Sequence, residues 1–340
     1  MRIAVVGAGA IGGITAAFMA QAGQDITLVC KHPEIAAQAA GRGLHLEGVR
    51  GSHDIPVRAV ATVQELSGVF DACLIATKAY DLEQAARDML PYLSEDSLVV
   101  SMQNGICTDA LAAVVGPRRT VGCVIGWGAT MKGPGSLEMT SGGEFILGMA
   151  EGGCPPRLTA LQGAMSTVTP CEISPNIYAQ LYSKLIVNAC ITSLGAICGL
   201  RLGEMMKRAD ARNIFLAIIQ EAMDVAHALG LSVPPFGGKL DYDRLMAGSG
   251  VISRLRRHGM IRLVGLKFRR LKSSSLQSLE RGKPTEIDYF NGYIAAKGRE
   301  CGVATPVNDA LTAMVKAIER GELAISTDNL SAPAFRALRY

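Results

Sequence analysis

The side chains best suited to chemistry lie in an otherwise apolar stretch between positions 178 and 197. Lys184, Asn188 and Thr192 recur there every fourth residue, and an α-helix places side chains at that spacing on one face. A row of amine, amide and hydroxyl groups in an apolar helix costs free energy unless a polar partner faces it. An ammonium group can stabilise the charge that develops on a carbonyl oxygen and then protonate it. We therefore interpret the row as a catalytic and substrate-binding face, and the alternative is a helix with one narrow solvated edge.

The carboxylate of Glu286 is a second candidate. It stands in the run Thr285-Glu-Ile-Asp288, which has the pattern of a capping box at the start of a helix predicted to reach Cys301. Asp288 lies at the offset of the box partner. Glu286 is therefore either a first-turn acid that the helix dipole favours or a group of an active site.

A glycine-rich turn near the start predicts a dinucleotide site. It follows a short apolar strand, opens a helix, and is followed by a second strand at 25–30. In such a turn the first glycine makes the bend, the second admits the pyrophosphate, and the third lets helix pack on strand, while the helix N-terminus attracts the phosphates. The residues expected to contact the cofactor there are Gly7, Ala8, Gly9, Ala10, Ile11 and Gly12.

The end of the second strand indicates which dinucleotide binds. NAD enzymes commonly carry an acid there for the ribose 2′-hydroxyl. This chain has Cys30-Lys31-His32 and no acid before Glu34. Lys31 would attract a 2′-phosphate, so we predict NADP(H) over NAD(H); the alternative is an ordinary solvated lysine.

The elements that must position these groups are of two kinds. Apolar β-type runs alternate with helical patterns over residues 1–174, which predicts an α/β, doubly wound, mostly parallel sheet of the Rossmann type. Helical patterns fill 175–340, which predicts an all-α substrate and catalytic domain. The predicted strands are Ile3–Val6, Ile26–Val29, Ala72–Ala76 and Leu98–Ser101, with Val121–Ile125, Ser136–Thr140, Glu144–Leu147 and Thr169–Ile173 extending the sheet. The predicted helices are Ile11–Gln21, Leu82–Leu93, Leu158–Ser166, Tyr178–Ile197, Asn213–Leu229, Thr285–Cys301 and Asn308–Arg320.

Composition excludes several other kinds of site. Nine cysteines without a Cys-x-x-Cys pair and five histidines without His-x-x-x-His spacing indicate neither a disulfide framework nor a metal site. A net charge of +4 does not by itself indicate nucleic acid and suits small anionic ligands. The uncharged stretch 3–24 is broken by glycines, and that of 185–200 is too short to cross a bilayer. We therefore expect a soluble, cytoplasmic protein with no membrane or nucleic-acid partner.

The segment Arg254–Lys272 is basic and interleaved with apolar residues. We interpret it as a helical segment whose cations are solvated and cover apolar surface, partly at a subunit contact. The alternative is a surface for nucleic acid or an anionic membrane.

At these residues the chain resembles the ketopantoate reductase (2-dehydropantoate 2-reductase) family over essentially its whole length. The resemblance implies an NADP-dependent oxidoreductase acting on CH–OH groups, which reduces ketopantoate to pantoate in pantothenate and coenzyme A biosynthesis. It also implies a C-terminal domain of the 6-phosphogluconate-dehydrogenase-like type. The shared motifs are the glycine run, Ala76-Thr-Lys78-Ala79, Gln103-Asn104-Gly105, Gly133-Pro-Gly135, Lys184-Leu-x-x-Asn188 and the block from Ser274 to Gly292.

The resemblance also implies roles for single residues. Lys184 matches the general acid, and Glu286 matches the active-site glutamate, which would also contact the cofactor. Substrate contacts are implied for Asn188, Thr192, Ser274 and Asn104, and further cofactor contacts for Lys31, Lys78, Asn104 and Ala129.

The chain departs from the family pattern at three places. Thr192 and Leu202 stand where many members carry asparagine, and the segment 236–272 is long and basic. The substrate is therefore open, and a paralogue acting on another branched or hydroxylated 2-oxo acid is one alternative. A hydroxyisobutyrate- or opine-type dehydrogenase and a non-catalytic NADP-binding regulator are others, and both a monomer and a homodimer remain open.

Overall fold

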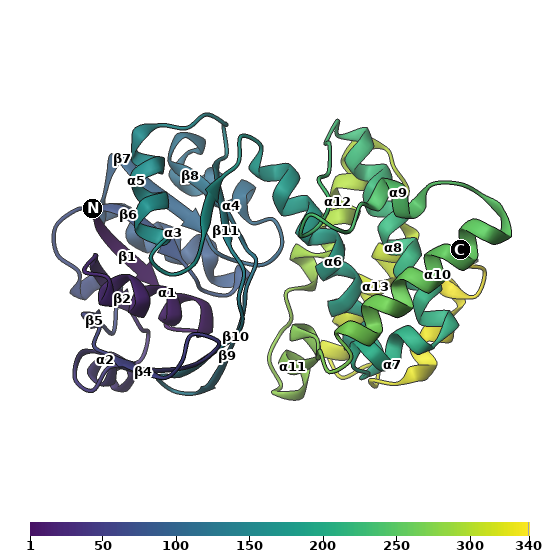
Figure 1. The fold of residues 1–340 in the computed structure, drawn as a ribbon, viewed down its shortest axis with the longest axis horizontal. Coiled ribbons are helices and arrows are strands. Elements are labelled where there is room, and N and C mark those ends of the chain that lie inside the picture. The colour runs from purple at the N-terminus through teal and green to yellow at the C-terminus, as the bar shows by residue number, and fades with distance from the viewer. Residues whose placement is uncertain (339) are drawn as a thin grey trace. The chain divides into compact units, whose positions relative to one another are not determined.

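The computed structural model describes residues 1–338 and 340, and it groups them into two compact units, Met1–Leu181 and Tyr182–Tyr340 (Figure 1). The division falls inside helix α6 (Ile177–Cys198) rather than in the loop before it, where the sequence predicted it. The first turn of α6 packs on the sheet of the first unit, because a Cβ added at Gly122 would lie 2.7 Å from Ile177.

The first unit is built on an eight-stranded sheet in the order β12-β11-β8-β7-β6-β1-β2-β5. Neighbouring strands are parallel except for the pair β11 and β8. This confirms the doubly wound, mostly parallel sheet. The strands are β1 (Arg2–Val6), β2 (Asp25–Val29), β5 (Ala59–Val60), β6 (Phe70–Ile75), β7 (Leu93–Ser101), β8 (Thr120–Ile125), β11 (Phe145–Met149) and β12 (Cys171–Ile173). The helices of this unit are α1 (Ala10–Gln21), α2 (Pro33–Ala40), α3 (Leu82–Met89), α4 (Thr108–Val115) and α5 (Pro156–Met165).

A second, four-stranded sheet corrects one prediction. The strand predicted at Ser136–Thr140 does not extend the main sheet; it forms β10 (Ser136–Ser141) in the order β4-β3-β10-β9. The buried Leu137 side chain of β10 packs against α1, since a Cβ added at Gly13 would lie 2.5 Å from it. The other strands are β3 (Leu44–Gly48), β4 (His53–Ile55) and β9 (Gly128–Gly133).

The second unit is helical, and no β-strand occurs among its described residues. Its core forms around α6 and α8 (Ala209–Ala228), which are tied by the hydroxyl of Tyr182 donating to the backbone oxygen of Ala222 at 2.9 Å. The all-α prediction is confirmed. The remaining helices are α7 (Leu202–Lys207), α9 (Tyr242–Met246), α10 (Gly250–Lys267), α11 (Ser274–Glu280), α12 (Asn291–Cys301) and α13 (Pro306–Glu319).

The predicted helix start at Thr285 is wrong. A 3₁₀ turn, η5 (Ile287–Tyr289), precedes α12, which begins only at Asn291. The backbone N–H and hydroxyl of Thr285 both donate to Glu319 of α13, at 2.7 and 2.6 Å, and Asp288 pairs with Lys316. Two partners from another helix therefore replace the expected capping box.

Helix α6 is long and apolar enough to cross a bilayer by length and composition, so, contrary to the prediction, its length does not exclude a membrane span. Within the structure 78% of its apolar window is buried. That burial is typical of the core helix of a globular unit.

Candidate active site

The glycine run forms the bend between β1 and α1. Gly7 has a φ of +113°, and a Cβ there would lie 2.9 Å from the backbone carbon of Ala76. At Gly12 a Cβ would lie 2.0 Å from the backbone oxygen of Gly7. Only glycine fits these two positions. This confirms the expected roles of the first glycine in the bend and of the third in the packing of helix on strand.

Gly9 differs from its neighbours because nothing lies within 4 Å of where its Cβ would be. It is the N-cap residue of α1, whose first turn carries no acid and no side-chain cap. The first-turn N–H groups of a helix lack intrahelical partners and favour an anion. The space and the donors therefore fit the pyrophosphate of a dinucleotide.

Lys31 lies one residue beyond Cys30 at the carboxyl end of β2, next to the end of β1. It is the one non-glycine residue with positive φ, +67°, in the part of the chain that the structure describes. This left-handed conformation costs free energy outside glycine and is common at functional sites. Glu34, the nearest acid in sequence, lies 3.9 Å from the His32 imidazole.

The ends of β6 and β7 are joined by Gln103, a buried residue that the sequence motif contained but to which we assigned no role. Its amide donates to the backbone oxygens of Ile75 and Thr77, at 2.9 and 3.1 Å, and its carbonyl accepts from Ser101 at 2.7 Å. Asn104 and Lys78, the two predicted cofactor contacts on these loops, are exposed.

Ala129 lies apart from these loops. It is half-buried in β9 of the second sheet, where it pairs with Met139. The structure therefore does not place it on the strand ends that carry the other predicted cofactor residues of this unit, and its contact with the cofactor stays a prediction.

The predicted polar row lies on α6, and the helix confirms its spacing. Lys184 and Asn188 are half-buried together with Val187 and Ile191, so one side of a buried helix remains accessible. The Asn188 side-chain nitrogen is buried and has no hydrogen-bond partner among the described residues. An unsatisfied buried donor costs roughly 1–3 kcal/mol, and such groups commonly mark a functional role.

Thr192 differs from the other two members of the row. It is only 5% exposed, and its hydroxyl donates to the backbone oxygen of Asn188 at 2.7 Å. Its hydroxyl proton is therefore engaged in a hydrogen bond to the backbone of α6.

Glu286 and the serines lie on neighbouring segments of the same unit. Glu286 is buried and precedes η5. Ser273 caps α11 by accepting from the N–H of Leu276 at 3.2 Å, and a Cβ added at Gly195 of α6 would lie 2.4 Å from the Ser273 hydroxyl. The start of α11 therefore packs directly on α6.

Of the three consecutive serines, the predicted one, Ser274, is exposed. Ser275 is buried with a hydroxyl that has no hydrogen-bond partner among the described residues. The sequence could not distinguish Ser274 from Ser275, because they differ only in which side of α11 they occupy.

Comparison with known proteins bears on this arrangement. Residues 3–152 match the family model described as ketopantoate reductase PanE/ApbA, and residues 176–319 match the model of its C-terminal part. A 2-dehydropantoate 2-reductase of Mesorhizobium japonicum is 30% identical, over 94% of this chain and 99% of the relative. The chain belongs to the ketopantoate reductase family. The resemblance seen in the sequence is thereby confirmed.

Two solved structures show how far the likeness extends. A ketopantoate reductase family protein from Ralstonia eutropha is 28% identical with a TM-score of 0.80, covering 95% of this chain and 99% of that one. D-mandelate dehydrogenase, solved with NADH and anilino(oxo)acetate, is 25% identical with a TM-score of 0.79 and the same coverage. These two proteins therefore share one fold although their names state different substrates.

Proposed function

We propose that this ketopantoate reductase family member reduces a 2-oxo acid to a 2-hydroxy acid, with NADPH as hydride donor and ketopantoate as substrate. The observation that carries the proposal is the accessible side of α6, where Lys184 stands one turn from the unsatisfied amide of Asn188. The 2-dehydropantoate 2-reductases of M. japonicum and Aquifex aeolicus, 30% and 27% identical, support the choice of substrate.

In the proposed mechanism each residue has one task. NADPH, when bound, supplies the hydride that adds to the carbonyl carbon. The ammonium of Lys184 donates a hydrogen bond to the carbonyl oxygen, stabilises its developing charge and transfers a proton to it, becoming a neutral amine. The Asn188 amide donates to the substrate carboxylate or hydroxyl, while Glu286 and Ser274 position the amine and the substrate.

The cofactor would be held by residues of the first unit. The backbone of the Gly7–Gly12 run would bind the pyrophosphate, and Lys31 would bind the 2′-phosphate. Further contacts are proposed for Lys78, Asn104 and Ala129. Because D-mandelate dehydrogenase was solved with NADH, the fold alone does not choose the cofactor, and the choice of NADPH rests on the charge of Lys31.

A substrate panel tests the proposal. NADPH oxidation is followed with ketopantoate, 2-oxoisovalerate, pyruvate, glyoxylate and the 2-oxo acid that corresponds to mandelate. We expect the highest kcat/KM with ketopantoate. A preference for the aryl acid would favour a mandelate-type reductase, which the D-mandelate dehydrogenase likeness makes the second candidate, and NADPH binding without turnover of any acid would indicate a regulator.

The role of Lys184 is tested on the best substrate of that panel. Lys184→Ala should lower kcat by roughly 100-fold or more, the usual cost of losing a general acid. Lys207→Ala, which removes an exposed lysine of α7, is the control. A Lys184→Ala enzyme with near wild-type turnover would remove this residue from the mechanism.

We also propose that the protein works in the cytoplasm. All nine of its cysteines are free, and unpaired thiols are typical of reducing compartments.

A further inference from the structure

Helix α10 presents its apolar side chains outward. The five most exposed large apolar residues in the described part of the chain all lie on it, with 62–84% of their surface exposed. Four of them are spaced three to four residues apart around Gly259, which places them along one side of the helix. We call this side the apolar stripe; it consists of Ile252, Leu255, Gly259, Leu263 and Leu266.

The opposite side of α10 is fixed on the protein. Ile261 and Gly265 are its buried residues, and a Cβ added at Gly265 would lie 2.4 Å from the Cβ of Met206 on α7. Arg256 and Arg257 donate to backbone oxygens in and after α9. The helix therefore cannot rotate about its axis to bury the apolar stripe. We expected the cations of this segment to cover its apolar surface, but the stripe is exposed.

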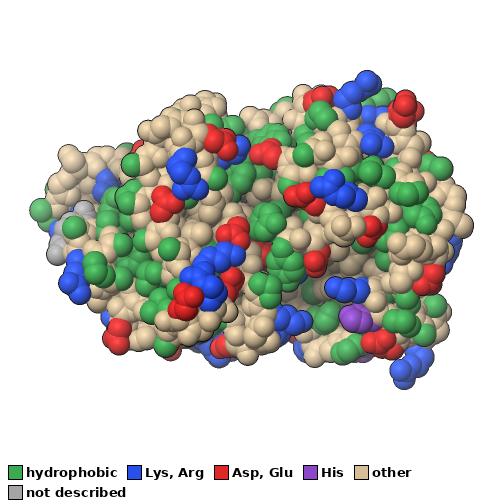
Figure 2. All heavy atoms as spheres, turned by 180° about the vertical axis from the view of Figure 1, so that it is seen from behind, with side chains coloured by type: hydrophobic (Ala, Val, Ile, Leu, Met, Phe, Trp, Pro, Cys, Tyr) green, Lys and Arg blue, Asp and Glu red, His purple; other side chains and the backbone are tan. Residues whose placement is uncertain are grey.

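The charge around the apolar stripe has one sign. Residues 250–279 contain eight lysines and arginines and no acid. On the face of the molecule drawn in Figure 2, by contrast, basic and acidic side chains are interspersed. An exposed apolar patch bordered by cations matches a surface that is itself apolar inside and anionic outside.

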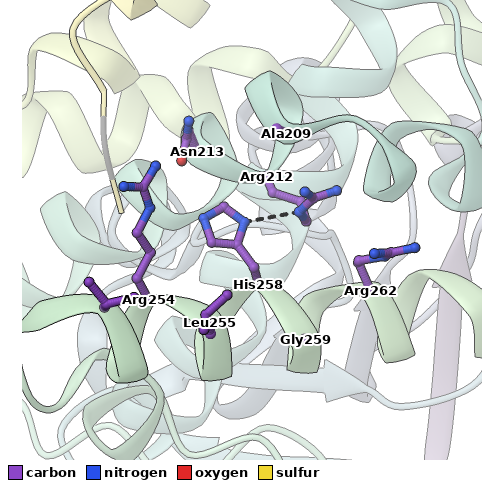
Figure 3. Close-up of a pocket in the computed structure, with 9 residues that line it drawn as sticks. Ala209, Arg212, Asn213, Arg254, Leu255, His258, Gly259 and Arg262 are labelled. Atoms are coloured by element: carbon purple, nitrogen blue, oxygen red, sulfur yellow. Dashed lines mark hydrogen bonds between the residues drawn. The ribbon is translucent and has the colours of Figure 1, made fainter.

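A basic pocket of about 500 Å³ opens beside the apolar stripe and shares Leu255 and Gly259 with it. Figure 3 shows Arg254 and His258 rising from α10 toward α8, His258 toward Arg212, with Arg262 further along α10. Arg254 and Arg262 have no acidic partner among the described residues.

The cations of the pocket act on one another. Arg212 donates to the His258 imidazole at 2.9 Å. Burial and the nearby arginines lower the pKa of His258, although its other nitrogen lies 2.7 Å from the backbone oxygen of Tyr340. Burial and Arg262 lower the pKa of Arg212 against the opposite effect of Asp210. A phosphate group entering the pocket would relieve this repulsion and accept from several arginines at once.

A second copy of the chain fits the apolar stripe poorly. Arg256 and Arg262 lie three residues before and after Gly259, so two α10 helices that crossed there, parallel or antiparallel, would bring arginines of both copies close together. Like charges placed opposite each other oppose association.

We propose that the apolar stripe and the basic pocket together bind the surface of an anionic phospholipid bilayer. The stripe enters the boundary between headgroups and acyl chains, and the pocket takes a lipid phosphate. Such binding is peripheral and leaves the two units folded as described. It also replaces our sequence-based expectation of no membrane partner.

The test is co-sedimentation of the full chain with vesicles. Vesicles of phosphatidylcholine are compared with vesicles containing about one quarter phosphatidylglycerol, because each basic residue near an anionic surface favours binding about fivefold. We expect binding to the anionic vesicles only, falling several-fold between about 0.1 M and about 0.5 M NaCl as the charges are screened.

Two variants separate the parts of the surface. Leu255→Gln with Leu263→Gln should lower vesicle affinity about tenfold or more, since two leucines no longer enter the apolar layer. Arg254→Gln with Arg262→Gln should lower it by a similar factor and reduce the salt dependence. Val49→Gln and Arg118→Gln, exposed residues of the first unit, are the matched controls. Thermal unfolding followed by circular dichroism establishes that each variant is folded.

Three outcomes would overturn the proposal. Wild-type protein that stays in the supernatant with anionic vesicles is the first. A stable dimer that Leu255→Gln with Leu263→Gln dissociates, without vesicle binding, would assign the apolar stripe to a second copy. Inorganic phosphate that raises the melting temperature through Arg254 and Arg262, without vesicle binding, would assign the pocket to a soluble anion.

Discussion

At the scale of single residues, two positions carry a cost in the free protein that a ligand would offset. The side-chain nitrogen of Asn188 is buried without a hydrogen-bond partner, and Lys31 holds a left-handed backbone. Both positions were selected from the sequence for chemistry, one by its spacing from Lys184 and one by its place after a strand. Structural strain at residues chosen for another reason supports a functional role.

Asn188→Ala should separate binding from stability. Removing the unsatisfied donor relieves its cost, but truncation of the half-buried side chain loses packing, so the two effects should offset and the free energy of unfolding should change by less than about 1 kcal/mol. The KM for the 2-oxo acid should rise roughly 10- to 150-fold, since a hydrogen bond to a charged carboxylate is worth roughly 1.5–3 kcal/mol. Urea unfolding and steady-state kinetics measure the two effects, and a loss of stability with unchanged KM would make Asn188 a structural residue.

Lys31→Gly should likewise give two opposite effects. Glycine adopts positive φ without strain, so the protein without cofactor should gain roughly 0.5–1 kcal/mol of stability. The loss of the cation should lower the preference for NADPH over NADH in kcat/KM. Lys31→Asp, which adds an acid where NAD enzymes carry one, should lower it further. An unchanged preference in both variants would contradict the assignment of the 2′-phosphate to Lys31.

At the scale of elements, one buried carboxylate organises the start of α13. Glu221 of α8 accepts from the backbone N–H groups of Val307 and Asn308, at 2.8 and 2.9 Å, and from the Asn308 side chain at 2.7 Å. Asn308 in turn accepts from the Asn291 amide at 2.9 Å. This chain of polar groups joins α8, α12 and α13, and both carboxylate oxygens of Glu221 accept hydrogen bonds in it.

Glu221→Gln should destabilise the protein by about 1–3 kcal/mol. An amide NH₂ in place of one oxygen would face a donor, which leaves a buried N–H unsatisfied. Chemical unfolding measures the change, and Asp224→Asn, the same carboxylate-to-amide exchange at an exposed position of α8, is the control. Equal stability of Glu221→Gln and wild type would show that the carboxylate does not hold α13.

The same residue gives a pH dependence whose sign follows from its pKa. Burial raises the pKa of Glu221, so the folded protein binds this proton more tightly than the unfolded chain. The contribution to stability is therefore fully present below the unfolded pKa and is lost as the pH rises through the folded one. The free energies of unfolding of wild type and Glu221→Gln are compared between about pH 4 and 7. The value for wild type minus that for the variant should decline as the pH rises, and an increase would contradict the raised pKa.

At the scale of the whole molecule, the two cores bury almost every thiol. Of the nine cysteines only Cys154 is exposed, and Cys301 is half-buried. Burial raises the pKa of Cys30 to about 11 and that of Cys73 to about 12. Thiolates are the reactive form of cysteine, so folding of both units protects the chain from thiol reagents.

A thiol-reactive chromogenic reagent should therefore report the integrity of both cores. The native protein should show one fast-reacting thiol, and Cys154→Ser should abolish it. The remaining thiols of the wild-type protein should react only when urea unfolds the chain, and the wild-type total is then nine. Two or more fast thiols in the native Cys154→Ser variant would indicate that a core opens locally.

The sequence by itself determined the elements whose cause is local. The glycine run marks a bend that only glycine can make, and apolar runs that alternate with helical patterns require buried parallel strands. The four-residue spacing of Lys184, Asn188 and Thr192 puts them on one side of any helix. These features depend on neighbours in the chain, so they could be read before any contact was known.

Only the tertiary structure decided what depends on distant partners. Strand β10 left the main sheet because β3, some 90 residues earlier in the chain, pairs with it. Thr285 lost its predicted cap because Glu319 binds it. The outward turn of the apolar stripe on α10 follows from the packing of Gly265 on Met206. An amphipathic pattern predicts that a helix has two sides, but the element packed against it determines which side faces the solvent.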